Sequence, residues 1–218
     1  LTAAKGTKPG GFNTALGAGL GVLPLNLISF NEEKAWNYEA GIKSSLMGGK
    51  LIANAAVFYI DWTNVQIDDS FRNPNGTTIG YTSNAGKARV KGLEIGLQAL
   101  PTDNLDLSLG YSYNPSRVFN VQDSRASASG IITTGWRQLP FSSDHSVSGS
   151  IRVNGKVNST WGWYAQLDSR FDSTQYATTA NLTETGDRFV SNIRVGLEDD
   201  DWSIQGYVKN LFDSDTAV

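Results

Sequence analysis

Residues 105–113 read Leu-Asp-Leu-Ser-Leu-Gly-Tyr-Ser-Tyr, with a large apolar or aromatic side chain at every odd position and a small or acidic one at every even position. Successive side chains of a β-strand point to opposite faces, so this stretch predicts a strand with one apolar face and one polar face. The same period of two runs through 36–46, 93–99, 147–153, 161–171, 189–197 and 202–208. The stretch 53–60 is apolar at both parities, and alternation assigns no faces to it.

The connections between these stretches are long and short in turn. The long ones cover 9–34, 63–86, 114–144 and 172–187, and the short ones lie at 47–50, 100–103, 154–157 and 199–201. An up-and-down sheet with all its long loops at one end produces this rhythm, and transmembrane β-barrels have short periplasmic turns and long extracellular loops. We therefore expect an all-β fold, an antiparallel up-and-down transmembrane β-barrel.

Composition is consistent with this fold and excludes several functions. The chain has 218 residues, a net charge of −3, no cysteine and a mean hydropathy of −0.28. No run reaches the roughly 18 apolar residues of a helical span, whereas barrel strands expose only alternate side chains to lipid. The lack of cysteine excludes disulfides and thiolate metal sites. The lack of a basic patch in the sequence argues against a nucleic-acid partner.

Charged residues occupy the polar parity deep within the predicted strands. They are Glu39, Lys43, Glu94, Arg152, Asp168, Arg170, Arg194 and Glu198. Four acids and four bases suit the wet inner wall of a barrel, where they would face the lumen. The solvated face of a soluble β-sandwich would carry them equally well.

Aromatic residues occupy the apolar parity at two levels. Near the long loops lie Trp36, Tyr38, Tyr59, Tyr113, Phe171 and Phe189, and near the short turns lie Trp161, Trp163 and Trp202. Two aromatic levels separated by aliphatic residues are typical of the girdles of a membrane barrel. The alternative is the ordinary preference of aromatic residues for strands.

Five segments, in order along the chain, resemble motifs of TonB-dependent outer-membrane receptors. They are 8–13 (KPGGFN), 33–43 (EKAWNYEAGIK), 55–66 (AAVFYIDWTNVQ), 84–94 (NAGKARVKGLE) and 208–213 (VKNLFD). One departure is Glu32, which stands where the family usually has proline.

The resemblance implies that 1–218 is the C-terminal portion of the barrel domain, roughly eight or nine strands of about 22. The plug domain and the final strand of the family are expected to be absent. The implied function is active transport of a scarce solute, most often an iron–siderophore complex, across the outer membrane of a Gram-negative bacterium. The implied partners are outer-membrane lipid, the solute, and the TonB complex through the plug, with no cofactor and no enzymatic activity.

The predicted extracellular loops carry the candidate ligand contacts Arg72, Arg117, Arg125, Trp136 and Arg137. Guanidinium and indole groups suit an anionic, aromatic-bearing chelate through charge-assisted hydrogen bonds and stacking. The alternative is a generic polar loop.

The sequence gives only weak signals for a catalytic site or a metal site. His145 follows Ser142, Ser143 and Asp144, but neighbours on a strand point to opposite faces and do not assemble a catalytic triad. The run 199–201 is three aspartates, which predict a solvated turn rather than a calcium site. The alternative functions are a complete small barrel acting as adhesin or passive pore, and, more remotely, an outer-membrane hydrolase.

Overall fold

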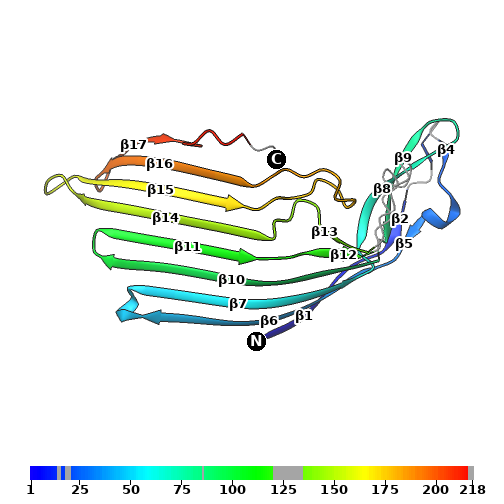
Figure 1. The fold of residues 1–218 in the computed structure, drawn as a ribbon, viewed down its shortest axis with the longest axis horizontal. Helices are drawn as coiled ribbons and strands as arrows, with labels where there is room; N and C mark the ends of the chain where they lie inside the picture. The colour runs from blue at the N-terminus through cyan, green and yellow to red at the C-terminus, as the bar shows by residue number, and fades with distance from the viewer. Residues whose placement is uncertain (14–15, 18–20, 85, 120–134, 216–218) are drawn as a thin grey trace.

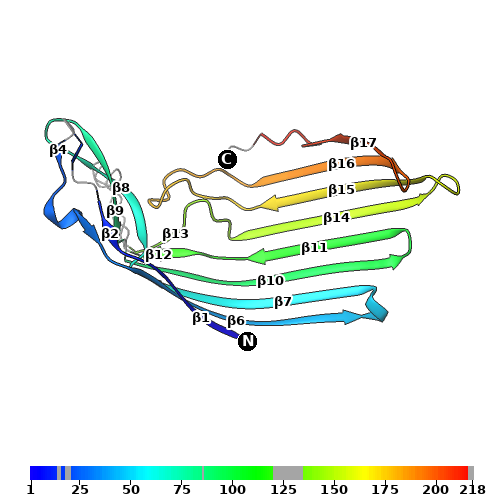
Figure 2. The same cartoon turned by 180° about the vertical axis from the view of Figure 1, so that it is seen from behind.

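One curved antiparallel sheet makes up most of the chain. The computed structural model describes residues 1–218 except 14–15, 18–20, 85, 120–134 and 216–218. The strand order is β1-β6-β7-β10-β11-β14-β15-β16-β17, and every neighbouring pair is antiparallel. Figures 1 and 2 show the long strands side by side, with β1 and β17 at opposite edges.

The long strands agree with the predicted stretches. Their bounds are β1 Thr2–Lys8, β6 Glu33–Leu46, β7 Leu51–Thr63, β10 Lys87–Thr102, β11 Leu105–Tyr113, β14 His145–Lys156, β15 Gly162–Asp172, β16 Arg188–Glu198 and β17 Ser203–Val208. The short elements are β2 Gly11–Phe12, β3 Leu16–Gly17, β4 Gly21–Val22, η1 Leu25–Leu27, β5 Ser29–Phe30, η2 Met47–Gly49, β8 Gln66–Arg72, β9 Thr78–Asn84, β12 Arg117–Phe119 and β13 Trp136–Gln138. The structure confirms the predicted antiparallel, up-and-down sheet. The sheet is an open segment of a barrel wall, with β1 and β17 at its two edges.

The loop asymmetry is also present in the structure. In Figure 1 the turns joining β6 to β7, β10 to β11, β14 to β15 and β16 to β17 all lie at one end of the sheet. The long connections lie at the other end and have secondary structure of their own, which the sequence prediction did not include. Within them β8 pairs with β9, and β12 pairs with both β10 and β13.

The register settles the faces of β7, which alternation left open. Ala55 lies opposite Ile42 and Ile95, so Ala55, Val57 and Tyr59 belong to the apolar face. Phe58 belongs to the polar face, where it lies opposite Gly92. A Cβ at Gly92 would lie 2.5 Å from Cζ of Phe58, so the missing side chain of the glycine leaves room for the aromatic ring.

Among the described residues, buried apolar side chains outside the long strands cluster at the long-loop end. Val65, Ala88 and Val118 are 0–4% exposed and form a small core against Trp62, Ile67 and Leu139. This core fixes the base of the β8–β9 hairpin and of β12 to the sheet. Within the described ranges, no helix is long and apolar enough to cross a membrane.

Candidate functional site

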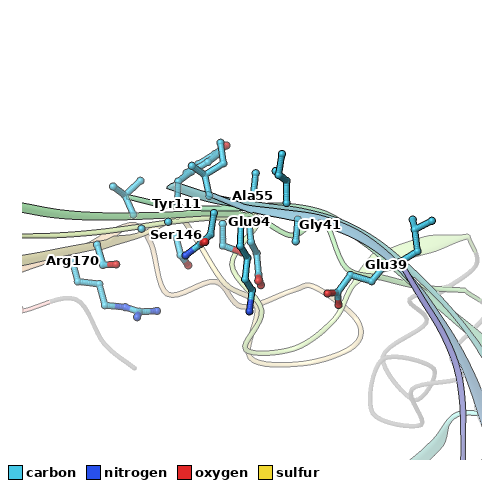
Figure 3. A pocket seen from close by; sticks show the side chains of 18 residues that line it. Glu39, Gly41, Ala55, Glu94, Tyr111, Ser146 and Arg170 are labelled. Atoms are coloured by element: carbon cyan, nitrogen blue, oxygen red, sulfur yellow. The ribbon is translucent and has the colours of Figure 1, made fainter. Parts of the chain in front are cut away.

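The polar face of the sheet forms a charged wall. Glu39, Lys43, Glu94 and Arg170 line a hollow of about 820 Å³ that spans β6 to β15. Figure 3 shows Glu39 and Arg170 projecting from one side of the sheet, and the strands bend toward that side. All four lie at the parity that the sequence assigned to the inner wall, opposite to the row of Ile42, Ala55 and Tyr111.

The charges at the two ends of this wall are paired differently. Toward β16, Nη2 of Arg152 lies 3.1 Å from Glu198, and Nη2 of Arg194 lies 3.2 Å from Asp168. Arg170 binds Asp172 through two contacts of 2.7 Å. Toward β6, by contrast, Glu39, Lys43 and Glu94 form no ion pair with any residue that the structure describes. The β6–β10 part of the wall therefore has charges free for a further partner.

At the long-loop end, four side-chain amides and the backbone of Asn31 join segments that are far apart in the sequence. We call this set the rim network; its members are Asn13, Asn31, Asn64, Gln66 and Asn84. The Asn84 amide accepts from the Asn31 backbone N–H at 2.7 Å and donates to the Asn31 and Asn64 carbonyl oxygens at 3.0 and 2.9 Å. Nε2 of Gln66 donates to the carbonyl oxygens of Pro9 and Asn31 at 2.9 and 3.1 Å.

Asn13 repeats this mode of binding at Thr82, two residues before Asn84 in β9. Its Oδ1 accepts from the Thr82 backbone N–H at 2.8 Å, and its Nδ2 donates to the Thr82 carbonyl oxygen at 2.8 Å. Asn13 and Asn84 thus each bind both backbone groups of one residue, as a β-strand partner does. The rim network therefore holds the segment 9–34 against the β8–β9 hairpin.

The family motifs in the sequence mark most of this network. All its members except Asn31 lie in the five motif segments, at loop positions outside the strand alternation. Their partners are up to 69 residues away, and the alternation of a strand carries no information on such contacts.

The predicted ligand contacts do not form one cluster. Arg72 ends β8, while Arg117, Trp136 and Arg137 lie on the paired strands β12 and β13. Arg125 lies outside the described residues. Nη1 of Arg137 is 3.4 Å from the Ala180 carbonyl oxygen. The role of all these residues in ligand binding stays a prediction.

Arg117 already has a carboxylate partner. Its Nη1 and Nη2 donate to Oδ1 and Oδ2 of Asp144 at 2.7 and 2.5 Å. The hydrogen bond to Asp144 raises the pKa of Arg117 above its ordinary value, against the opposing effect of burial. Such a two-pronged pair ties β12 to the start of β14 and fixes the orientation of the guanidinium group.

The β8–β9 hairpin has a titratable pair of its own. The Tyr81 hydroxyl donates to Oδ2 of Asp69 at 3.1 Å. Burial, reinforced by the charge of Asp69, raises the pKa of Tyr81 to about 12. Tyr81 is therefore a neutral hydrogen-bond donor at physiological pH.

Asp144, His145 and the aspartates of 199–201 form hydrogen bonds that do not build a catalytic triad or a calcium site. Asp144 binds Arg117, and Nδ1 of His145 lies 3.0 Å from the Tyr111 hydroxyl oxygen. Oδ1 of Asp199 accepts from the backbone N–H groups of Asp201 and Trp202 at 2.8 and 2.6 Å, which makes the run a tight turn. Among the described residues, no group of His, Asp and Glu is arranged to hold a metal ion.

Both the sequence and the fold of this chain are similar to those of known proteins. The family model described as "TonB dependent receptor-like, beta-barrel" matches residues 1–211. This chain belongs to that family. The TonB-dependent receptor family consists of receptors and transporters rather than enzymes, and its barrels lie in the outer membrane of Gram-negative bacteria.

Individual relatives of this receptor segment are named for siderophores. The ferric-pyoverdine M114 receptor PbuA of Pseudomonas sp. (strain M114) is 28% identical over 184 residues, which are 81% of this chain and 20% of the relative. The catecholate siderophore receptor Fiu of Escherichia coli (strain K12) is 28% identical over 157 residues, 69% of this chain and 20% of the relative. The chain thus spans about a fifth of the length of these curated relatives.

The fold is also that of solved receptors. The ferric yersiniabactin uptake receptor FyuA from Yersinia pestis superposes with a TM-score of 0.74 at 22% identity, over 97% of this chain and 29% of that one. The siderophore receptor PiuA from Acinetobacter baumannii gives a TM-score of 0.67 at 21% identity, over 97% and 29% of the two chains.

Proposed function

We propose that this chain is the C-terminal part of the barrel wall, with its extracellular loops, of a TonB-dependent active transporter for an iron–siderophore complex in the outer membrane. The observation that carries the proposal is the family match over 1–211, together with relatives named for pyoverdine and catecholate siderophores. The rest of the transporter, including a plug and a final strand, is supplied by residues outside this chain. A complete small barrel has less support, since β1 and β17 lie at opposite edges of the sheet.

In this proposal each part of the segment has a distinct task. The unpaired charges Glu39, Lys43 and Glu94 face the plug from the inner wall. The rim network fixes the extracellular segments 9–34 and 63–86 to each other. Arg72 and Arg137, on the loops, contribute positive charge toward an anionic chelate. TonB, acting on the plug, releases the solute to the periplasm.

The test is iron uptake by the organism that carries the gene. A deletion strain is grown with one ferric chelate at a time as its iron source, from a panel of catecholate, hydroxamate and carboxylate types. Loss of growth on one chelate class, restored by the intact gene, supports the proposal. Unchanged growth on the whole panel, with no chelate bound by the purified receptor, would reject it.

A further inference from the structure

Two arginines and a serine lie close together on the inner face of the sheet, where β15 and β16 reach the long-loop end. Asp172 ends β15 and lies directly opposite Arg188, the first residue of β16. Arg170 lies two residues before Asp172 and projects from the same face, as Figure 3 shows. Diagonal neighbours such as Arg170 and Arg188 are about 7–8 Å apart, within reach of long side chains. The two guanidinium groups can therefore contact one small ligand.

Asp172 orients Arg170 without using all of its hydrogen-bond donors. The Asp172 carboxylate accepts from Nε and Nη2 of Arg170 at 2.7 Å each, and from the Ser146 hydroxyl at 2.7 Å. The Asp172 side chain is 8% exposed, whereas the Arg170 side chain is 62% exposed. A guanidinium group has five N–H donors, so the Nη1 donors and one on Nη2 remain for a ligand. A buried carboxylate thus holds an exposed guanidinium in a fixed orientation.

Arg188 adds a cation that the wall does not neutralise. It is exposed, and among the residues that the structure describes no carboxylate lies within 4.0 Å of its guanidinium group. The next acid along β15, Asp168, pairs with Arg194 at 3.2 Å. Two carboxylates, Asp168 and Asp172, therefore face three guanidinium groups, those of Arg170, Arg188 and Arg194. One positive charge is left over in this part of the wall.

Ser148 adds a hydroxyl group beside Arg170. It lies on β14 directly opposite Arg170, and its hydroxyl forms no hydrogen bond in the described part of the chain. On its other side lies Gly110 of β11, where a Cβ would be 2.8 Å from Oγ of Ser148. The glycine therefore leaves room for this hydroxyl on the surface of the wall.

The three residues line a second hollow next to the one described above. This smaller hollow has a volume of about 370 Å³ and is lined by Arg170, Arg188 and Ser148. Arg170 and Ser148 also line the larger hollow of about 820 Å³, so the two adjoin. None of the described residues that line the smaller hollow is aromatic, so a catechol ring would find no side chain to stack on. The forked donors of arginine match the two coplanar oxygens of a carboxylate.

We propose that Arg170, Arg188 and Ser148 bind a free carboxylate group of the transported ferric chelate. The proposal rests on the proposed function, and it narrows the cargo to chelates with carboxylates that are not bound to iron. The smaller hollow receives this carboxylate, and the larger hollow receives the rest of the chelate. A carboxylate of the plug would meet the same donors, and the experiment separates these two sources.

The test compares the full-length receptor with its R188Q variant, which removes the unneutralised cation and leaves the Arg170–Asp172 pair intact. Equilibrium binding to the purified receptor in detergent is measured with two probes: ferric citrate, which has free carboxylates, and a ferric tris-catecholate, which has none. Loss of a charge-assisted hydrogen bond should weaken ferric citrate binding roughly 10-fold or more. R188K keeps the charge but loses the fork, so its affinity should fall between the two.

The matched control is R89Q, which makes the same change at the long-loop end but on the opposite face, where Arg89 is 49% exposed. It should bind ferric citrate as the unmodified receptor does. Equal ferric citrate binding by R188Q and the unmodified receptor would overturn the site.

Two further outcomes would overturn the assignment to the chelate. If the unmodified receptor binds the tris-catecholate and not ferric citrate, the carboxylate class is wrong and the proposed transport function stands. If R188Q admits a large hydrophilic antibiotic faster than the unmodified receptor does, the carboxylate belongs to the plug. Binding of neither probe would also overturn the site, and growth on the chelate panel would then decide the proposed function separately.

Discussion

Asn84 makes three hydrogen bonds with one amide group, as donor and acceptor at once. Aspartate in its place keeps the acceptor and loses the donor. The Asn31 and Asn64 carbonyl oxygens would then face a carboxylate instead of an N–H group. Leaving such groups unsatisfied costs about 1–3 kcal/mol. We expect Asn84→Asp to loosen the rim network, measured as faster hydrogen exchange in 9–34 and 63–86 of the full-length receptor.

Asn75 provides the matched control, since it lies in the same hairpin and uses its side chain differently. Its Oδ1 accepts from the backbone N–H and the hydroxyl of Thr77 at 3.0 and 2.7 Å. Asn75→Asp keeps this acceptor, so exchange in 9–34 should remain unchanged. Equal exchange in the two variants would contradict the role assigned to Asn84.

At this scale the sequence predicted residue types but not partners. The motif 84–94 identified Asn84 as part of a family pattern, yet its partner Asn31 is 53 residues away. The sequence alone favours Arg117 as a ligand contact, because no partner for a loop arginine can be identified in it. In the structure Asp144, 27 residues further on, holds its guanidinium group. Side-chain pairs between residues this far apart in the sequence can be identified only once the fold is known.

Among the elements, β7 and β11 show where alternation suffices and where it fails. β11 occupies 105–113 as predicted, because its large and small residues alternate strictly. In β7 both parities are apolar, and the inward-facing Phe58 looks like a lipid-facing residue in the sequence. What permits it on the polar face is Gly92 on the neighbouring strand, a relation between two elements.

Gly92 therefore tests the packing of β7 on β10. A Cβ there would overlap the Tyr113 carbonyl oxygen and lie 2.5 Å from Cζ of Phe58. The backbone oxygen cannot move without disturbing the ladder, and overpacking of this kind costs about 1–3 kcal/mol. We expect Gly92→Ala to lower the thermal unfolding temperature of the receptor in detergent.

Gly96 is the control on the same strand and face, because a Cβ there has nothing within 4 Å. Gly96→Ala should unfold at or above the temperature of the unmodified receptor, since replacing glycine in a strand also removes freedom from the unfolded chain. If both variants unfolded alike, the close approach at Gly92 would not constrain the sheet.

At the scale of the whole molecule, the antiparallel topology of the long strands can be predicted from the sequence. The structure of the long loops cannot. Connections of a few residues at 47–50, 100–103, 154–157 and 199–201 can only join adjacent antiparallel strands, so they determine four strand pairs. The alternation of long and short connections predicts the up-and-down order of the remaining neighbours. The long connections carry no such restriction. Their hairpins and the small core around Ala88 depend on contacts between segments, which the alternation of single strands does not encode.

The unequal pairing along the inner wall leads to a prediction for the assembled receptor. Arg152, Arg194 and Arg170 have carboxylate partners within the wall, whereas Glu39 and Glu94 have none among the described residues. If these two carboxylates pair with the plug, their removal weakens plug seating without weakening the barrel. We expect E39Q/E94Q in the full-length receptor to admit a large hydrophilic antibiotic several times faster, at an unchanged unfolding temperature of the barrel.

The control for this variant is Asp103→Asn, in a short turn at the far end of the sheet, where the side chain is exposed. It removes a carboxylate without touching the wall, so antibiotic entry should stay at the level of the unmodified receptor. Equal entry in cells with E39Q/E94Q, at equal receptor abundance, would mean that the plug does not use these charges. The variant Glu198→Gln tests the part of the wall in which the charges are paired. It leaves the Arg152 guanidinium without its carboxylate partner. We expect it to lower the stability of the barrel and to leave the entry of the antibiotic unchanged.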